Sequence, residues 1–175
     1  VLSYDSELEA FRDLQRMLGP APVYLIDTYD TLEGARKAVS LGQPLWGVRL
    51  DSGNLVELAP AVRKILDDAG FKDAKIMASG DLNEYKILEL VAAGVPIDAF
   101  GVGTDLSTSS DSPALGAVYK MVGVASKGKD RLVAKFAGSG KTTLPDVKQI
   151  FRFADHDLIG LASEPRPPKA EALLQ

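Results

Sequence analysis

Four short apolar runs in this chain of 175 residues each lead into polar or flexible residues. They are ValTyrLeuIle before Asp27–Thr28, TrpGlyValArgLeu before Asp51–Ser52–Gly53, IleMetAla before Ser79–Gly80–Asp81, and AlaPheGlyVal before Gly103–Thr104. In α/β barrels and open parallel sheets, the carboxyl ends of the strands form the binding face. The pattern therefore predicts a parallel α/β fold whose strand ends bind a ligand.

Strand-like and helix-like periods alternate over the first hundred residues. After a first helix at 6–18, we expect strands at 23–26, 45–50, 74–78 and 99–102, with helices at 32–41, 55–69 and 84–93. The repeat of roughly 25 residues favours barrel-like winding. Since a closed (β/α)8 barrel typically needs about 250 residues, the expected fold class is α/β, a partial (β/α) barrel.

The predicted helices begin with the same chemistry, a polar residue followed three positions later by glutamate. The pairs are Ser6 with Glu9, Asp30 with Glu33, Asn54 with Glu57, and Asp81 with Glu84. This spacing matches a capping box, in which the first side chain accepts a hydrogen bond from a helix amide. Capping accounts for Asp30 and Asn54, and for part of the role of Asp81.

The hydrophobic period changes after Leu115, where short and possibly antiparallel strands are expected near 118–124, 131–136 and 148–153. We therefore expect a partial barrel at 1–124, a small β-rich appendage at 125–162 and a proline-rich C-terminal arm at 163–175.

The composition excludes several classes of function. With 20 basic and 24 acidic residues, the chain has no field that attracts nucleic acid or an anionic membrane. The absence of cysteine excludes disulfides and thiolate chemistry within this sequence. No apolar stretch approaches the ~20 residues of a membrane span, and the N-terminus does not resemble a signal peptide. We expect a cytoplasmic protein.

Asp27, Arg49 and Asp51 are the strongest candidates for chemistry. Asp27 has no capping partner, and a carboxylate at a strand end can bind a sugar hydroxyl or metal-bound water. Arg49 and Asp51 point to the same side of their strand, because side chains alternate along it. Arginine can grip a carboxylate or phosphate, and aspartate can orient a sugar diol or a divalent ion. Alternatively, the two form a scaffolding ion pair that only closes the end of the barrel.

Small and hydroxyl residues at the same strand ends are candidates for substrate binding: Thr28, Ser52, Gly53, Ser79, Gly80, Asp81, Gly101, Gly103 and Thr104. Glycine lets backbone amides approach a ligand closely, and a Gly-Thr turn after a late strand is a candidate phosphate cradle. No residues are assigned to a metal.

Three other motifs are assigned no function. The stretch 108–113 is interpreted as a polar turn around a proline. The GlySerGlyLysThrThr motif at 138–143 lacks the earlier glycine and the following helix of a P-loop. His156 lies between two aspartates and is interpreted as a solvated turn residue.

The motifs LeuIleAspThrTyrAspThr, ValArgLeuAspSerGly, AlaSerGlyAspLeu and PheGlyValGlyThr closely resemble, in order and spacing, those of nicotinate phosphoribosyltransferases. The likeness runs from Val1 to at least Val124. It implies a type II phosphoribosyltransferase barrel that transfers phosphoribosyl from phosphoribosyl pyrophosphate to nicotinate in NAD salvage, with Mg²⁺ and with ATP as co-substrate.

The resemblance also implies residue roles and partners. Asp27, Arg49 and Asp51 match family positions near the ribose and the pyridine or diphosphate. Gly80 and Asp81 match a ribose-side loop, and Gly103 and Thr104 match the 5′-phosphate loop. Electrostatic stabilisation of an oxocarbenium-like sugar is the implied mechanism. Family members are dimers, so a homodimer is expected.

Two departures from the family pattern stand out. Asn54 replaces a common aspartate but still suits a helix cap. The family's phosphorylatable histidine precedes a segment like the one that begins this chain, so we expect the chain to associate with the N-terminal part of the enzyme and to be inactive alone. The alternatives are a noncatalytic phosphate-binding or interaction module, and a relative that uses nicotinamide or quinolinate.

Overall fold

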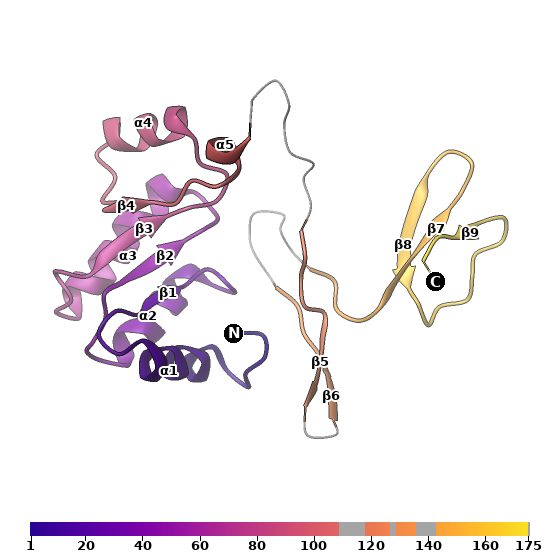
Figure 1. The fold of residues 1–175 in the computed structure, drawn as a ribbon, viewed down its shortest axis with the longest axis horizontal. Helices are drawn as coiled ribbons and strands as arrows, with labels where there is room; N and C mark the ends of the chain where they lie inside the picture. The colour runs from indigo at the N-terminus through magenta and orange to yellow at the C-terminus, as the bar shows by residue number, and fades with distance from the viewer. Residues whose placement is uncertain (109–117, 127–128, 136–142, 175) are drawn as a thin grey trace. The chain divides into compact units, whose positions relative to one another are not determined.

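The computed structural model describes residues 1–108, 118–126, 129–135 and 143–174 (Figure 1). These residues form two compact units, each of which is described by itself. The first unit takes in residues 1–108 with 118–119 and 135. The second unit takes in residues 120–126, 129–134 and 143–174. No helix in the described part of the chain has the length and apolarity required to cross a bilayer.

A four-stranded parallel sheet forms the centre of the first unit, in the order β1-β2-β3-β4. Its strands are β1 (Val23–Leu25), β2 (Gly47–Leu50), β3 (Lys75–Ala78) and β4 (Ala99–Phe100). Tyr24 pairs with Val48, and Val48 with Ile76. Sequence order and spatial order coincide, as in a barrel segment and unlike a doubly wound sheet, where the order reverses.

Helices connect successive strands of this sheet, which confirms the predicted alternation. The connecting helices are α2 (Thr31–Ser40), α3 (Leu55–Asp68) and α4 (Glu84–Ala92), while α1 (Glu7–Leu18) precedes β1 and the short α5 (Thr104–Ser107) follows β4. The sequence did not predict α5. Parallel strands need such crossover connections, and right-handed crossovers between strands in sequential order place the connecting helices on one face.

Three of the four predicted helix caps are confirmed. The Ser6 side chain accepts a hydrogen bond from the backbone amide of Glu9, the Asp30 side chain from that of Glu33, and the Asn54 side chain from that of Val56. The prediction for Asp81 is wrong.

The cap of α4 is Asn83, whose side chain accepts from the amide of Lys86 at 3.0 Å. Asp81 has φ of 51°, so it lies in the left-handed turn that precedes the cap. Asp81 is therefore not the N-cap of α4.

Apolar side chains from strands and helices fill a common core. Its fully buried members are Tyr24, Ile26, Ala35, Ala38, Val48, Leu50, Ala59, Val62, Leu66 and Ile76. Helix α2 approaches the sheet so closely that a Cβ on Gly34 would lie 2.1 Å from the carbonyl oxygen of Ile26. This packing fixes the strands, and so fixes the polar residues that follow them.

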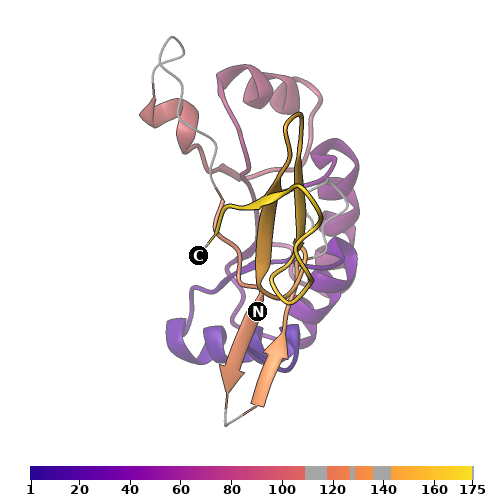
Figure 2. The same ribbon diagram turned by 90° about the vertical axis from the view of Figure 1, so that its right-hand side faces the viewer.

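The second unit consists of short antiparallel strands. Strands β5 (Gly123–Ser126) and β6 (Lys129–Leu132) form one pair, while β7 (Lys148–Arg152) lies between β8 (Asp157–Leu161) and β9 (Glu171–Ala172). Figure 2 shows β7 and β8 side by side as a hairpin. β5 begins later than the strand expected at 118–124, and the sequence did not predict β8 or β9. β9 lies within the segment expected to be a C-terminal arm and pairs with β7.

Candidate functional site

The polar ends of β1 and β2 are joined through the carboxylate of Asp27. Its Oδ2 atom accepts a hydrogen bond from the Asp51 amide at 3.0 Å and another from the Ser52 hydroxyl. Asp27 is only 3% exposed, because it follows the buried Ile26 at the end of the strand. Its other oxygen, Oδ1, is buried and has no hydrogen-bond partner among the described residues. Asp27 is therefore a buried acceptor with one oxygen still available.

The ends of β2 and β3 are joined by a second set of contacts. The Arg49 guanidinium donates from Nε to Ser79 Oγ at 2.7 Å and from Nη2 to Asp51 Oδ1 at 2.8 Å. Ser79 Oγ in turn donates to Asp51 Oδ1 at 2.7 Å. The Arg49 and Asp51 side chains are 43% and 27% exposed. The predicted ion pair is present and lies within reach of solvent.

A cavity of about 330 Å³ opens over the ends of β2, β3 and β4. Among the residues predicted to form the site, those that line it are Arg49, Ser79, Gly80, Asp81, Gly101, Gly103 and Thr104. Position 80 requires glycine, because its φ is 88° and a Cβ there would lie 2.1 Å from the Asp51 carbonyl oxygen. The backbone at this strand end therefore lies directly against the neighbouring strand end.

The remaining predicted residues do not line the cavity: Asp27, Thr28, Asp51, Ser52 and Gly53. Asp51 connects to it by accepting hydrogen bonds from Arg49 and Ser79, and Asp27, which also accepts from Ser52, connects through the Asp51 amide. Thr28 is buried, at 6% exposure. Gly53 has φ of 84° in the turn before α3. The structure thus brings the catalytic candidates into one network and separates Thr28 and Gly53 from the cavity.

Sequence reasoning missed four residues that line the cavity: Met77, Leu82, Val102 and Asp105. Met77 lies two positions before Ser79, so the period of two along a strand was the signal that could have found it. Lys86 was also missed. Its ammonium group donates to the Asp81 carbonyl oxygen at 2.6 Å and so ties α4 to the turn at the cavity rim.

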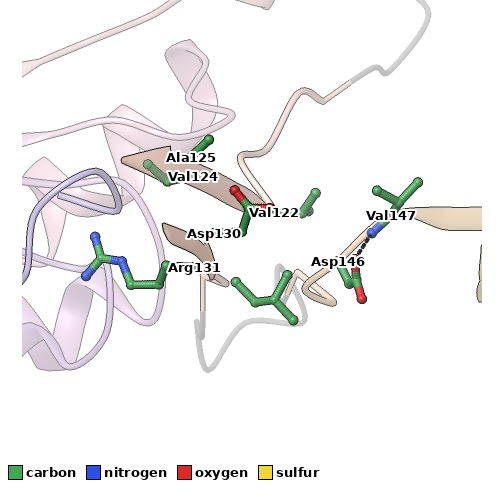
Figure 3. Close-up of a pocket in the computed structure, with 9 residues that line it drawn as sticks. Val122, Val124, Ala125, Asp130, Arg131, Asp146 and Val147 are labelled. Carbon is green, nitrogen blue, oxygen red and sulfur yellow. Dashed lines mark hydrogen bonds between the residues drawn. The ribbon is translucent and has the colours of Figure 1, made fainter. Parts of the chain in front are cut away.

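A second cavity, of about 300 Å³, lies in the second unit along β5 and β6 (Figure 3). The charged residues that line it are Asp130, Arg131 and Asp146. Figure 3 shows Arg131 extending away from Asp146, whose Oδ1 instead accepts from the Val147 amide at 2.7 Å. We assign no chemistry to this cavity.

The motifs set aside on sequence grounds do not join the site where the structure describes them. His156 is exposed in the turn between β7 and β8, where it stacks on Phe153 and contacts Asp155 at 2.8 Å. Most of the GlySerGlyLysThrThr motif, and most of the polar turn predicted at 108–113, lie outside the described residues.

Comparisons with known proteins connect this geometry to a family. The chain is 44% identical over 162 residues to the nicotinate phosphoribosyltransferase pncB2 of Mycobacterium tuberculosis, a match covering 89% of this chain and 34% of that protein. It is 42% identical over 160 residues to the nicotinate phosphoribosyltransferase of Bacillus subtilis, covering 87% of this chain and 32% of that one. This chain is a nicotinate phosphoribosyltransferase homologue.

The homologue spans about a third of the length of the curated relatives that it matches. The nicotinate phosphoribosyltransferase of Mus musculus is 35% identical over 143 residues, covering 74% of this chain and 26% of the relative. A crystal structure of human nicotinic acid phosphoribosyltransferase aligns with a TM-score of 0.47 and 26% identity, over 92% of this chain and 32% of that one. No family model matches the homologue.

Proposed function

We propose that this chain forms the sugar-phosphate-binding part of a nicotinate phosphoribosyltransferase. The whole enzyme would transfer phosphoribosyl from phosphoribosyl pyrophosphate to nicotinate, giving nicotinate mononucleotide in NAD salvage. The network that links Asp27, Asp51, Arg49 and Ser79 at the edge of a glycine-lined cavity carries the proposal. It places a cation, two carboxylates and accessible backbone at the same end of a parallel sheet, where such folds bind ligands.

Arg49 is the residue that we assign to an anionic group of the substrate. Of its five N–H donors, one contacts Ser79 and one contacts Asp51, and the guanidinium lines the cavity. The remaining donors suit a phosphate or carboxylate oxygen, and a fixed cation of this kind stabilises charge that develops on a departing diphosphate. Asp27 and Asp51 are assigned to ribose hydroxyls or to a cation that accompanies the diphosphate.

Magnesium fits this arrangement as a companion of the substrate. No group of three or more His, Cys, Asp or Glu side chains suited to a metal occurs in the described part of the chain. Mg²⁺ typically binds one or two protein carboxylates together with substrate phosphates. Asp27 Oδ1, which lacks a hydrogen-bond partner among the described residues, is a carboxylate oxygen of the required kind. When bound, Mg²⁺ would neutralise charge on the diphosphate.

The proposal extends to the whole enzyme. The sheet order agrees with a segment of a (β/α) barrel, and the curated relatives are about three times as long as the matched region. We therefore propose that transfer requires the remaining parts of the enzyme, that ATP is its co-substrate, and that it acts as a homodimer. No described residue is assigned to ATP.

Titration calorimetry of the purified chain with phosphoribosyl pyrophosphate and Mg²⁺ tests the binding role. We expect binding by the wild type, and loss of at least tenfold in affinity in Arg49→Ala, about 1.4 kcal/mol or more. Arg36→Ala is the matched control, because Arg36 forms an exposed pair with Glu33 on α2. Absence of binding by the wild type, or equal affinity in Arg49→Ala, would count against the proposal.

A test of activity uses a chimaeric enzyme, in which this chain replaces the matched third of the M. tuberculosis relative. We expect pyrophosphate release from phosphoribosyl pyrophosphate and nicotinate. Binding without turnover would favour a noncatalytic phosphate-binding module. Faster turnover of nicotinamide or quinolinate in competition would favour a relative with a different pyridine substrate.

A further inference from the structure

Ser79 lies between the two charged side chains of the proposed site because of the pairing of β2 with β3. In that register Leu50 is opposite Ala78, so the next residues along, Asp51 and Ser79, are neighbours. The Ser79 amide donates to the Leu50 carbonyl oxygen at 2.8 Å, which continues the parallel pattern past the end of the strand. Side chains alternate along each strand, so Ser79 projects to the same side as Arg49 and Asp51.

The three side chains close a ring of hydrogen bonds. Arg49 Nε donates to Ser79 Oγ at 2.7 Å, Ser79 Oγ donates to Asp51 Oδ1 at 2.7 Å, and Arg49 Nη2 donates to that same Oδ1 at 2.8 Å. Bonds that involve ionised partners are stronger than neutral ones, and each bond in such a ring polarises the next. The ring fixes the guanidinium at two of its nitrogens instead of one.

The Ser79 hydroxyl is committed to this ring. A hydroxyl carries one proton, and its contact to Asp51 Oδ1 is shorter than its alternative contact to the Leu50 carbonyl oxygen, at 3.3 Å. Ser79 is 6% exposed, whereas the Arg49 and Asp51 side chains are several times more accessible. Arg49 and Ser79 both line the cavity, and the Arg49 side chain is the more accessible of the two to a ligand that enters it.

We propose that Ser79 is a positioning residue, which orients the Arg49 guanidinium toward the ligand by joining it to the Asp51 carboxylate. This assignment rests on the proposed function for its ligand, and it is an alternative to the sequence-based expectation that Ser79 binds substrate directly. Without the hydroxyl, Arg49 keeps one bond to Asp51 and can rotate about it, so the cation reaches the ligand in a range of orientations. Positioned groups bind more tightly because less freedom is lost on binding.

The first test is independent of any ligand. In ¹⁵N-labelled chain, the Nε–H signal of Arg49, assigned by its loss in Arg49→Lys, reports on the bond to Ser79. We expect this signal to shift and its proton to exchange faster with water in Ser79→Ala, while the backbone amide spectrum is retained. Ser40→Ala is the control, since the Ser40 hydroxyl donates only to the Lys37 carbonyl oxygen at 2.8 Å, on α2. An unchanged Arg49 signal in Ser79→Ala overturns the proposal.

The second test measures phosphoribosyl pyrophosphate binding with Mg²⁺ in the same variants. We expect Ser79→Ala to weaken binding about tenfold, as for loss of one such hydrogen bond, and Ser40→Ala to bind as the wild type does. A changed Arg49 signal with unchanged affinity also overturns the proposal.

Ser79→Cys is measured beside Ser79→Ala, because a thiol occupies the position of the hydroxyl, with a somewhat larger atom, but is a weak donor and acceptor. Ser79→Cys is expected to behave as Ser79→Ala does. If the alanine variant fails to fold, the Arg49 signal and the affinity are measured in Ser79→Cys instead. If the wild-type chain does not bind phosphoribosyl pyrophosphate, the proposed function fails, while the Arg49 signal still decides whether Ser79 orients the guanidinium.

Discussion

The Asp27 carboxylate and the Asp51 backbone amide are joined by a 3.0 Å hydrogen bond between the ends of neighbouring parallel strands. The Ser52 hydroxyl donates to the same carboxylate oxygen. One buried side chain therefore holds the turn that follows β2, and that turn presents Asp51 to Arg49. The site and the scaffold share this contact, so its loss is measurable in stability as well as in binding.

Asp27→Ala is expected to lower the free energy of unfolding by about 2–3 kcal/mol, because it leaves the partly buried Asp51 amide and Ser52 hydroxyl without their acceptor. Urea denaturation measures this loss. Asp30→Ala is the control, since Asp30 is an exposed N-cap of α2 and its removal typically costs about 1 kcal/mol. An Asp27→Ala variant as stable as Asp30→Ala would show that the turn does not depend on this carboxylate.

Gly80→Ala is expected to destabilise the chain by about 3 kcal/mol or more, the range seen when backbone strain and a steric clash coincide. Its φ is 88°, and a Cβ would lie 2.1 Å from the Asp51 carbonyl oxygen. Gly70 separates the two effects, because its φ is 84° but nothing lies within 4 Å of its Cβ position.

Gly70→Ala should therefore lower the free energy of unfolding only through strain of the left-handed backbone, by about 1–2 kcal/mol. Denaturation curves of both variants give the difference. Equal losses in Gly70→Ala and Gly80→Ala would contradict the close approach of the two strand ends at Gly80.

Tyr24→Phe is expected to keep or raise stability at neutral pH, by up to about 1 kcal/mol, since the buried Tyr24 hydroxyl has no hydrogen-bond partner among the described residues. Burial also raises the pKa of Tyr24 above 10.0. Ionisation of Tyr24 therefore leaves stability unchanged below pH 10 and lowers it as the pH rises from 10 through the folded-state pKa.

Denaturation at pH 7 and above pH 10 checks both effects, and Tyr24→Phe should lose less stability than the wild type between the two. Tyr85→Phe, at a position 69% exposed, is the control and should change stability little at pH 7. A clear loss of stability at pH 7 in Tyr24→Phe would show that the hydroxyl has a stabilising contact.

The order of elements in the first unit could be predicted because it depends on local patterns. Apolar strands, amphipathic helices and polar caps each leave a period or a spacing in the sequence. Asp81 shows where this reasoning fails. Asp81 and Asn83 both precede the helix, and the backbone at Asp81 is left-handed, so Asn83 and not Asp81 caps α4.

The second unit was harder to predict. Its strands are short, and β9 consists of two residues that pair with β7 across a long separation in sequence. Such pairing depends on contacts between distant residues, and a proline-rich segment leaves no local signal for it. The sequence therefore indicated an antiparallel appendage but not its three-stranded sheet.

Sequence alone determined that carboxylates and glycines follow successive strands and that an arginine lies near the end of one, because side-chain alternation and strand ends are local properties. Only the tertiary structure decided how these residues meet. The register of β2 against β3 places Ser79 beside Asp51, and the close approach at Gly80 brings the two turns together. Register is set by packing of the buried face, so it is a property of the whole sheet. That packing makes Ser79 the residue that joins Arg49 to Asp51.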